Sequence, residues 1–237
     1  MHSGSEMIRL PLAALPVIAA CSLWGCAGEP ASSAQPTTAD FEVFAISDGQ
    51  RTGLPATSAL VVVETAWFWA DEITLVGDRG RVGDHEQLDG ERMVQGRALD
   101  LAAPMRIAFP DAPPGLYSGS VIDLEPPDEE DSRLPTDLRV AYRITGRTSQ
   151  GVPFTIRDRA DITLDLRAGD GVELGPGHML GVAVRFDLDA WWNGIDLGAL
   201  AAGGPVTIDG GPLLLRFRDN LIRSASLSLS TSPTAVR

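Results

Sequence analysis

The stretch Leu138-Arg-Val-Ala-Tyr-Arg-Ile-Thr145 decides the fold, because every second residue is apolar and most residues between them are polar. Asp161-Ile-Thr-Leu-Asp-Leu-Arg167 and Val182-Ala-Val-Arg-Phe-Asp-Leu-Asp189 repeat the pattern. A period of two is typical of antiparallel strands that bury one face. Alternation or short apolar runs predict further strands at residues 41–46, 59–69, 72–76, 105–109, 117–125, 152–156 and 225–229. About ten strands separated by turn residues predict a mostly β fold, a single antiparallel β-sandwich.

One or two short helices are predicted near the C-terminus. Asp189-Ala-Trp-Trp-Asn-Gly194 fits one helical turn, with Asp189 as the N-cap and Gly194 just beyond the last turn. Residues 212–223 fit a longer helix, because Pro212 suits a first helical position and four apolar residues share one helical face. A strand is the alternative, since Leu213, Leu215 and Phe217 also alternate.

Composition excludes several classes of function. The 237 residues include 19 basic side chains, all of them arginine, and 32 acidic ones, which gives a formal net charge of −13. Without lysine the chain has neither a Schiff-base lysine nor a phosphate-binding P-loop lysine. The acidic balance argues against nucleic acid as a partner, because that affinity comes mainly from basic side chains. The two cysteines, Cys21 and Cys26, both lie near the beginning, which argues against disulfides or thiolate zinc sites in the predicted sandwich.

The first 26 residues resemble a bacterial lipoprotein signal. Arg9 precedes an apolar run over residues 10–20 that is too short to span a bilayer. Ile18-Ala-Ala-Cys21 and Leu23-Trp-Gly-Cys26 each resemble a lipobox, the motif that ends in the lipidated cysteine. Cys26 is favoured and Cys21 is the alternative, because a polar segment follows Cys26. An ordinary secretory signal with two incidental cysteines is the other interpretation.

The lipobox resemblance implies a lipid anchor on Cys26. The residue after either cysteine is not the aspartate associated with inner-membrane retention, so the resemblance implies the outer membrane, facing the periplasm or the cell surface. The chain then divides into a signal peptide at residues 1–25, a flexible tether at residues 26–40 and a β-sandwich domain at residues 41–237.

Five segments of the body carry a second resemblance. They are Val63-Glu-Thr-Ala-Trp-Phe-Trp-Ala-Asp-Glu-Ile-Thr-Leu-Val76, Leu99-Asp-Leu101, Pro113-Pro-Gly-Leu-Tyr117, Gly151-Val-Pro-Phe154 and Phe186-Asp-Leu-Asp-Ala-Trp-Trp-Asn-Gly-Ile-Asp-Leu197. Together they resemble a group of uncharacterised bacterial lipoproteins with one extracytoplasmic β-sandwich, over about residues 41–230. The resemblance implies a fold and a location but no established chemistry. We therefore expect a non-enzymatic binding or structural interaction module with a protein or glycan partner.

Calcium is a candidate ligand, since oxygen-bearing side chains cluster near the C-terminus. Asp187, Asp189, Asn193 and Asp196 lie within ten residues, and carboxylates in an acidic secreted protein suit Ca²⁺. The spacing does not match the EF-hand loop, because Trp191 falls where a ligand belongs. The alternative interpretation is a strand end, a helix cap and a turn. The acidic run at residues 128–131 is interpreted as a solvated loop, as are the charged and glycine-rich residues 77–92.

Four tryptophans form a second candidate binding surface. Trp67 and Trp69 share one face of a predicted strand, and Trp191 and Trp192 are adjacent in the predicted helical turn. Exposed tryptophans can stack on sugars or anchor a protein partner, although tryptophan in a sandwich more often packs in the core or at the rim.

A hydrolase with an unrecognised carboxylate pair is a further alternative, but no catalytic motif supports it. The sequence has no Gly-x-Ser-x-Gly elbow, and beyond His2 it holds only two histidines, His85 and His178, both in predicted loops or turns. We therefore expect no enzymatic activity, and no cofactor other than calcium is a candidate.

Overall fold

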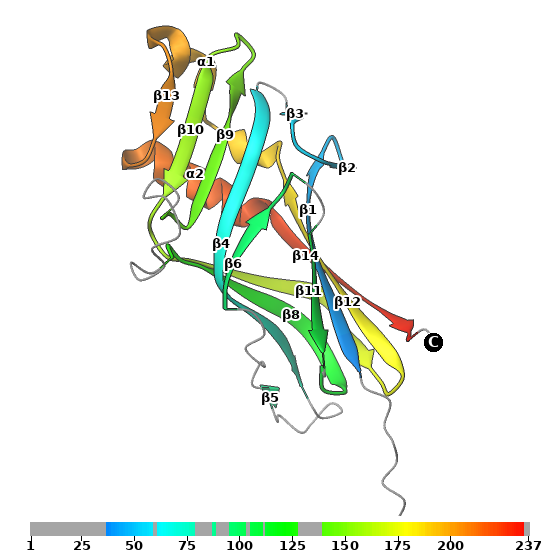
Figure 1. Cartoon of the computed structure of the whole chain (residues 1–237). Coiled ribbons are helices and arrows are strands. Elements are labelled where there is room, and N and C mark those ends of the chain that lie inside the picture. The colour runs from blue at the N-terminus through cyan, green and yellow to red at the C-terminus, as the bar shows by residue number, and fades with distance from the viewer. Residues whose placement is uncertain are drawn as a thin grey trace, which may run out of the picture. The chain divides into compact units, whose positions relative to one another are not determined.

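The structure is a computed structural model that describes residues 37–58, 61–78, 87–88, 95–102, 105–110, 112–127 and 139–234. It is mostly β, with two packed sheets and short helices near the C-terminus, which confirms the predicted fold class (Figure 1). In chain order the elements are β1 (Thr38–Ser47), β2 (Gln50–Thr52), β3 (Ala56–Ser58), β4 (Val61–Asp78), β5 (Gln87–Leu88), β6 (Gln95–Asp100), β7 (Met105–Pro110), β8 (Gly115–Leu124), β9 (Tyr142–Thr148), β10 (Pro153–Asp158), β11 (Ile162–Leu174), β12 (His178–Asp187), η2 (Ala190–Trp192), α1 (Leu197–Leu200), η3 (Ala201–Gly203), β13 (Val206–Ile208), α2 (Gly211–Ser224) and β14 (Ala225–Pro233).

Two sheets make up the sandwich. Among the described residues, sheet A has five strands in the order β14-β12-β1-β2, with β7 also paired to β1. In the same part of the chain, sheet B has nine strands in the order β11-β8-β4-β9-β10-β13, with β3, β5 and β6 also paired to β4. Most neighbours are antiparallel, as predicted, but β1 pairs with β12 and β10 pairs with β13 in parallel. Alternation reports which face of a strand is buried and carries no information about the direction of its neighbour.

A single 18-residue strand, β4, replaces the two strands predicted at residues 59–69 and 72–76. Its register against β8 shifts between Ala70 and Glu72, which marks a β-bulge, and this extra residue interrupts the alternation that the prediction followed. At Trp69 the amide donates to the Ala141 carbonyl and the carbonyl accepts from the Glu125 amide. Strand β4 therefore exchanges β9 for β8 as its neighbour at this point.

Aromatic side chains fill the space between the sheets. Phe68 of β4 stacks on Phe186 of β12 with ring centroids 5.1 Å apart, which joins sheet B to sheet A. Phe41 of β1 meets Phe109 of β7 edge-on at 5.8 Å. All four rings are fully buried, so they belong to the hydrophobic core on which the fold depends.

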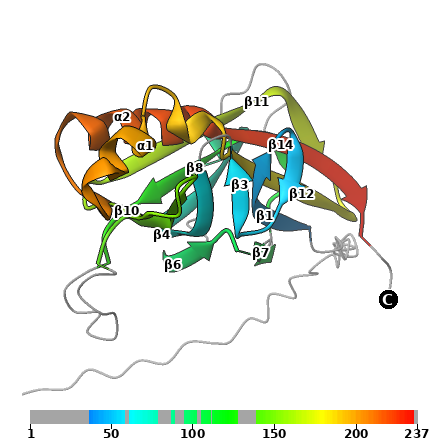
Figure 2. The same cartoon turned by 90° about the horizontal axis from the view of Figure 1, so that it is seen from above.

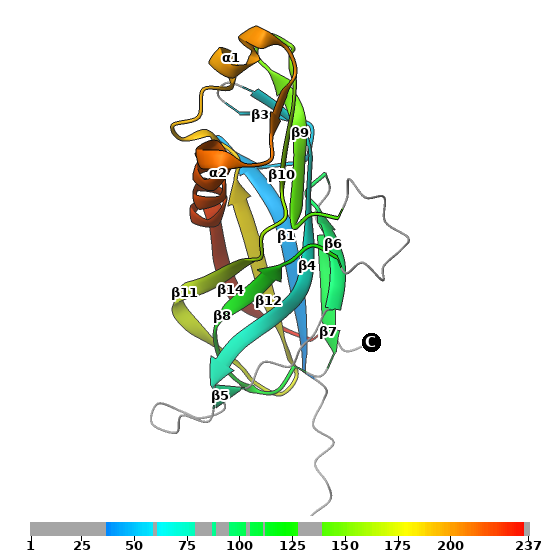
Figure 3. The same cartoon turned by 90° about the vertical axis from the view of Figure 1, so that its left-hand side faces the viewer.

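The helix predicted at residues 212–223 is confirmed as α2, which extends one residue further at each end. Pro212 lies in its first turn, where the missing N–H costs nothing. The buried face, formed by Leu214, Phe217 and Leu221, packs with η2 over the β9–β10 end of sheet B (Figure 2). Figure 3 shows α2 beside these strands from the side.

The boundaries of the predicted regions shift slightly. Strand β1 begins at Thr38 and so includes the last residues of the segment predicted as a tether. Within the segment predicted as a loop at residues 77–92, the end of β4 pairs with the short β5, and the remaining residues lie outside the described part of the chain. The helices that the structure describes all lack the length and apolar character of a membrane span.

Candidate functional site

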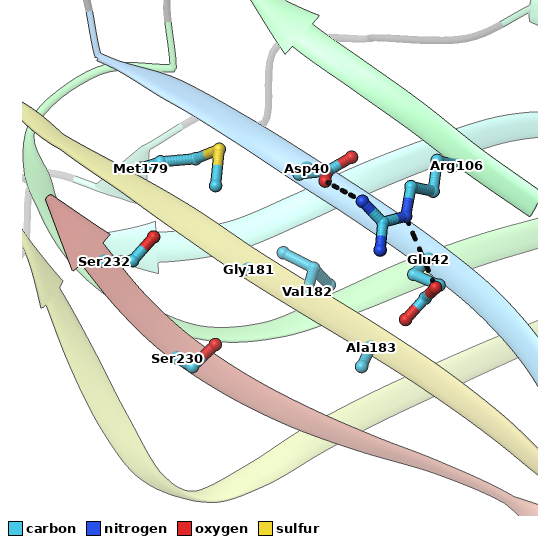
Figure 4. Close-up of a pocket in the computed structure, with 9 residues that line it drawn as sticks. All are labelled: Asp40, Glu42, Arg106, Met179, Gly181, Val182, Ala183, Ser230 and Ser232. Atoms are coloured by element: carbon cyan, nitrogen blue, oxygen red, sulfur yellow. Dashed lines mark ion pairs between the residues drawn. The ribbon is translucent and has the colours of Figure 1, made fainter. Parts of the chain in front are cut away.

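A shallow groove lies on the outer face of sheet A, where β7, β1, β12 and β14 run side by side. We call it the sheet A groove, and its cavity volume is about 180 Å³. Strand register explains its composition, because Asp40 lies opposite Gly181 and Gly181 lies opposite Ser230. The nine lining residues come from these four strands: Asp40, Glu42, Arg106, Met179, Gly181, Val182, Ala183, Ser230 and Ser232 (Figure 4).

Charged side chains form one wall of the groove. Arg106 lies between the two carboxylates, 3.8 Å from Asp40 and 3.5 Å from Glu42 (Figure 4). Glu42 also accepts two hydrogen bonds from Arg51, at 2.6 and 3.3 Å, and the Arg51 guanidinium lies 4.4 Å above the ring of Phe44. The wall therefore contains two carboxylates and the Arg106 guanidinium, and Arg51, which lies outside the lining, supplies a second guanidinium to Glu42.

The hydrogen bonds from Arg51 set the protonation state of Glu42. They lower the pKa of this carboxyl below its ordinary value, and the charges of Arg51 and Arg106 add to the effect, while partial burial opposes it. Glu42 is therefore ionised at neutral pH and accepts hydrogen bonds but does not donate them.

Small side chains form the floor of the groove. A Cβ atom on Gly181 would lie 2.7 Å from the Ser230 hydroxyl oxygen, so the absence of a side chain keeps this part of the floor open. Ala183 and Ser232 flank Gly181 on the same outer face. The backbone of the floor is rigid, because β12 is paired on both sides and its inner residues Val182 and Val184 are buried.

The predicted calcium ligands are not brought together as a metal site. Asp187 caps the Asp189 amide at 3.0 Å, Asp189 accepts from the Asp48 amide at 2.8 Å, and Asp196 caps the Ala199 amide at 2.9 Å. These contacts match the alternative interpretation of a strand end, a turn and a helix cap. Within the described ranges, no three His, Cys, Asp or Glu side chains gather where they could hold a metal ion.

Asn193 and the predicted N-cap also differ from expectation. The Asn193 backbone carbonyl accepts a hydrogen bond from the Asn220 side-chain amide of α2 at 2.9 Å. The turn predicted at residues 189–194 is a 3₁₀ helix, η2, whose N-cap residue Asp189 makes no side-chain capping bond. Its carboxylate instead holds the β1–β2 turn, as the contact with Asp48 shows.

Trp191 and Trp192 are core residues and do not form the candidate binding surface, which matches the alternative interpretation of tryptophan in the core or at the rim. Trp191 is 0 % exposed and donates from Nε1 to Ser224 Oγ at 2.9 Å, while Trp192 is 6 % exposed and packs edge-on against Phe154. Helix α2 buries both tryptophans, because its Phe217 contacts the two rings. The spacing of the tryptophans in the sequence did not predict this contact.

The predicted pairing of Trp67 and Trp69 on one strand face is confirmed. Both are half-buried on the outer face of sheet B, with ring centroids 5.9 Å apart, and Phe68 between them points into the core.

Several residues singled out in the sequence lie outside the described residues, namely Cys21, Cys26, His85 and the acidic run at residues 128–131. His178 is exposed, and its Nδ1 lies 3.2 Å from the Pro176 carbonyl of its own turn.

Sequence reasoning missed the sheet A groove. The alternation Asp40-Phe-Glu-Val43 was a usable signal, since it places both carboxylates on the outward face of one strand. The prediction began that strand at Phe41 and so left out Asp40. No sequence signal placed Arg106 or Gly181 beside β1, because both contacts join distant segments.

Comparisons with known proteins assign no function to the candidate site. No protein-family model matches the sequence, and no curated protein and no solved structure matches the chain.

Proposed function

We propose that the chain is a lipid-anchored, extracytoplasmic binding module without catalytic activity, and that the sheet A groove is its ligand site. The observation that carries the binding role is the groove itself, a concavity on the outer face of a sheet with charged side chains along one wall and small or apolar residues along its floor. Its charged wall and its glycine floor come from β7, β1 and β12, so the polar groups are held on a rigid scaffold. The anchor rests on the resemblance of Leu23-Trp-Gly-Cys26 to a lipobox.

The electrostatics of the groove favour binding over hydrolysis. A carboxyl that acts as a general acid needs a raised pKa, which burial in an apolar pocket provides. Arg51 lowers the pKa of Glu42 instead. Asp40 lies beside Arg106 in an open groove, where its side-chain oxygens can accept hydrogen bonds from a ligand.

Two measurements test this proposal. Mass spectrometry of the protein from membranes should find a diacylated or triacylated N-terminal Cys26, or Cys21; an N-terminus without lipid contradicts the anchor. For the binding role, the purified protein is sedimented with detergent-washed cell-wall material, which contains no bilayer that a lipid anchor could enter. Ala183→Arg, which fills the groove, should abolish co-sedimentation. Thr207→Arg adds the same charge at an exposed position of β13 and should have no effect. Equal sedimentation of all three proteins contradicts a role for the groove.

A further inference from the structure

We infer that the sheet A groove binds a neutral, polyhydroxylated ligand, namely one ring of a glycan. This inference rests on the proposed function and names the ligand class of the same site. It follows from three properties of the groove: its balanced charge, the hydrogen-bonding capacity of its wall, and the size and position of its floor.

Charge balance selects against ions. Asp40 and Glu42 are matched by Arg106 and Arg51, with three of the ion-pair distances at 2.6, 3.5 and 3.8 Å. A cation in the groove would have to compete with the two guanidinium groups, and an anion with the two carboxylates. A neutral ligand meets neither obstacle, although the chain as a whole carries a charge of −13.

The groove wall offers acceptors and donors side by side. Arg106 approaches Asp40 at 3.8 Å, beyond the usual hydrogen-bond distance, and Glu42 at 3.5 Å, at the long limit of a weak hydrogen bond. The Asp40 carboxylate therefore keeps acceptor capacity, and the Arg106 guanidinium keeps N–H donors. A carboxylate needs a donor and a guanidinium needs an acceptor, and two neighbouring sugar hydroxyls supply both.

The size and position of the groove fit one sugar ring better than an extended peptide. Its volume of about 180 Å³ lies below the roughly 300–1,000 Å³ typical of pockets for drug-sized ligands. The floor at Gly181 lies on the face of the sheet, whereas peptides that bind by strand addition pair with a sheet edge. Ser230 and Ser232 add hydroxyls along the far wall, and Met179 supplies an apolar contact.

The test is a titration of the purified mature protein in lauryldimethylamine oxide, a detergent without a sugar headgroup, followed by backbone amide NMR. The probes are maltotriose and tri-N-acetylchitotriose, with spermidine, calcium chloride and triglycine as comparison ligands. We expect at least one trisaccharide to shift the amides of Asp40, Glu42 and Gly181 saturably. The same amides should not respond to the comparison ligands.

Variants link the response to the groove. Gly181→Val fills the floor and should weaken trisaccharide binding at least about tenfold, which corresponds to roughly 1.4 kcal/mol. Arg106→Gln, which removes charge from the wall, should also weaken it. Gly169→Ala, at a site with no atom within 4 Å of the new Cβ, should leave it unchanged. The spectra also show whether each variant is folded.

Several results would overturn the inference. They are no response to either trisaccharide, a stronger response of the same amides to spermidine, calcium or triglycine, and trisaccharide binding that Gly181→Val leaves intact. Failure here is distinguishable from failure of the proposed function. If the protein still sediments with an envelope fraction through the groove, the ligand is not a glycan but the binding module stands.

Discussion

Removal of the Arg218 charge should destabilise the protein more than removal of any exposed arginine charge. Arg218 in α2 donates two hydrogen bonds to Asp158 at the end of β10, at 2.8 and 2.9 Å. The Asp158 side chain is 2 % exposed and that of Arg218 is 24 % exposed. Burial and the neighbouring Asp158 charge raise the pKa of Tyr142, so this hydroxyl stays neutral and cannot replace the lost charge.

The magnitude follows from what Arg218→Met leaves behind. Methionine keeps most of the apolar stem but leaves a buried carboxylate without its counter-charge, which typically costs about 3–5 kcal/mol. Asp158 Oδ1 still accepts from the Ala160 amide at 3.0 Å, so we expect the lower end, about 3 kcal/mol. In a domain of this size that corresponds to a fall in Tm of roughly 6–12 °C.

Urea denaturation followed by tryptophan fluorescence measures this loss. The signal reports on the α2 end of the domain, because the rings of Trp191 and Trp192 lie 6.0 and 5.5 Å from that of Phe217. The control is Arg147→Met, which breaks an exposed ion pair with Glu64 at 2.9 Å and should cost about 1 kcal/mol or less. If Arg218→Met costs no more than this control, the buried pair does not hold α2 as we argue.

Three further predictions test other parts of the structure. A neighbouring guanidinium lowers the folded-state pKa of Glu42, so its contribution to stability is present above pH 4.5 and lost as pH falls through the folded value. Glu42→Gln should therefore lower the urea midpoint relative to the unchanged protein above pH 4.5 but not at pH values below the folded-state pKa. A difference in midpoint that does not vary with pH contradicts this. Gly146→Ala should cost about 1–3 kcal/mol, because its Cβ would overlap a backbone carbonyl of β4, whereas Gly169→Ala should leave Tm unchanged. Trp191→Phe should lower Tm more than Trp192→Phe, since Trp191 Nε1 donates a buried hydrogen bond; equal losses would contradict it.

Local patterns predicted the elements well where alternation continued without interruption. Strands β11 and β12 follow the apolar positions of the quoted stretches, β9 begins at Tyr142 and so contains only the second half of the first stretch, and α2 follows its helical face and Pro212. The prediction failed in β4, where buried residues change phase after Val63 and again after Ala70. Both changes coincide with register shifts, so these irregularities hide the continuity of the strand in the sequence.

The candidate site could not be predicted in the same way, because its residues meet through pairings between distant segments. Asp40 and Gly181 are 141 positions apart in sequence and opposite one another in the β1–β12 pair. The predicted calcium cluster failed for the opposite reason. Its carboxylates are close in sequence, but each accepts a hydrogen bond from a nearby backbone amide, as short side chains near turns commonly do. The carboxylates therefore do not converge on one ion.

The arrangement of the core explains why the candidate site lies on the outer face of sheet A. The tryptophans of η2 are buried and cannot contact a ligand. Trp191 and Trp192 pack against Phe217 of α2, and they also contact Phe186 of sheet A and Phe154 of sheet B. The centre of sheet A is held independently by Phe41 and Val184, which are fully buried on the inner side of β1 and β12. Because these strands are fixed from within, Asp40, Glu42 and Gly181 keep their spacing without help from a ligand. A preorganised face of this kind loses little conformational entropy on binding, which is the property that a small, neutral ligand with few contacts requires.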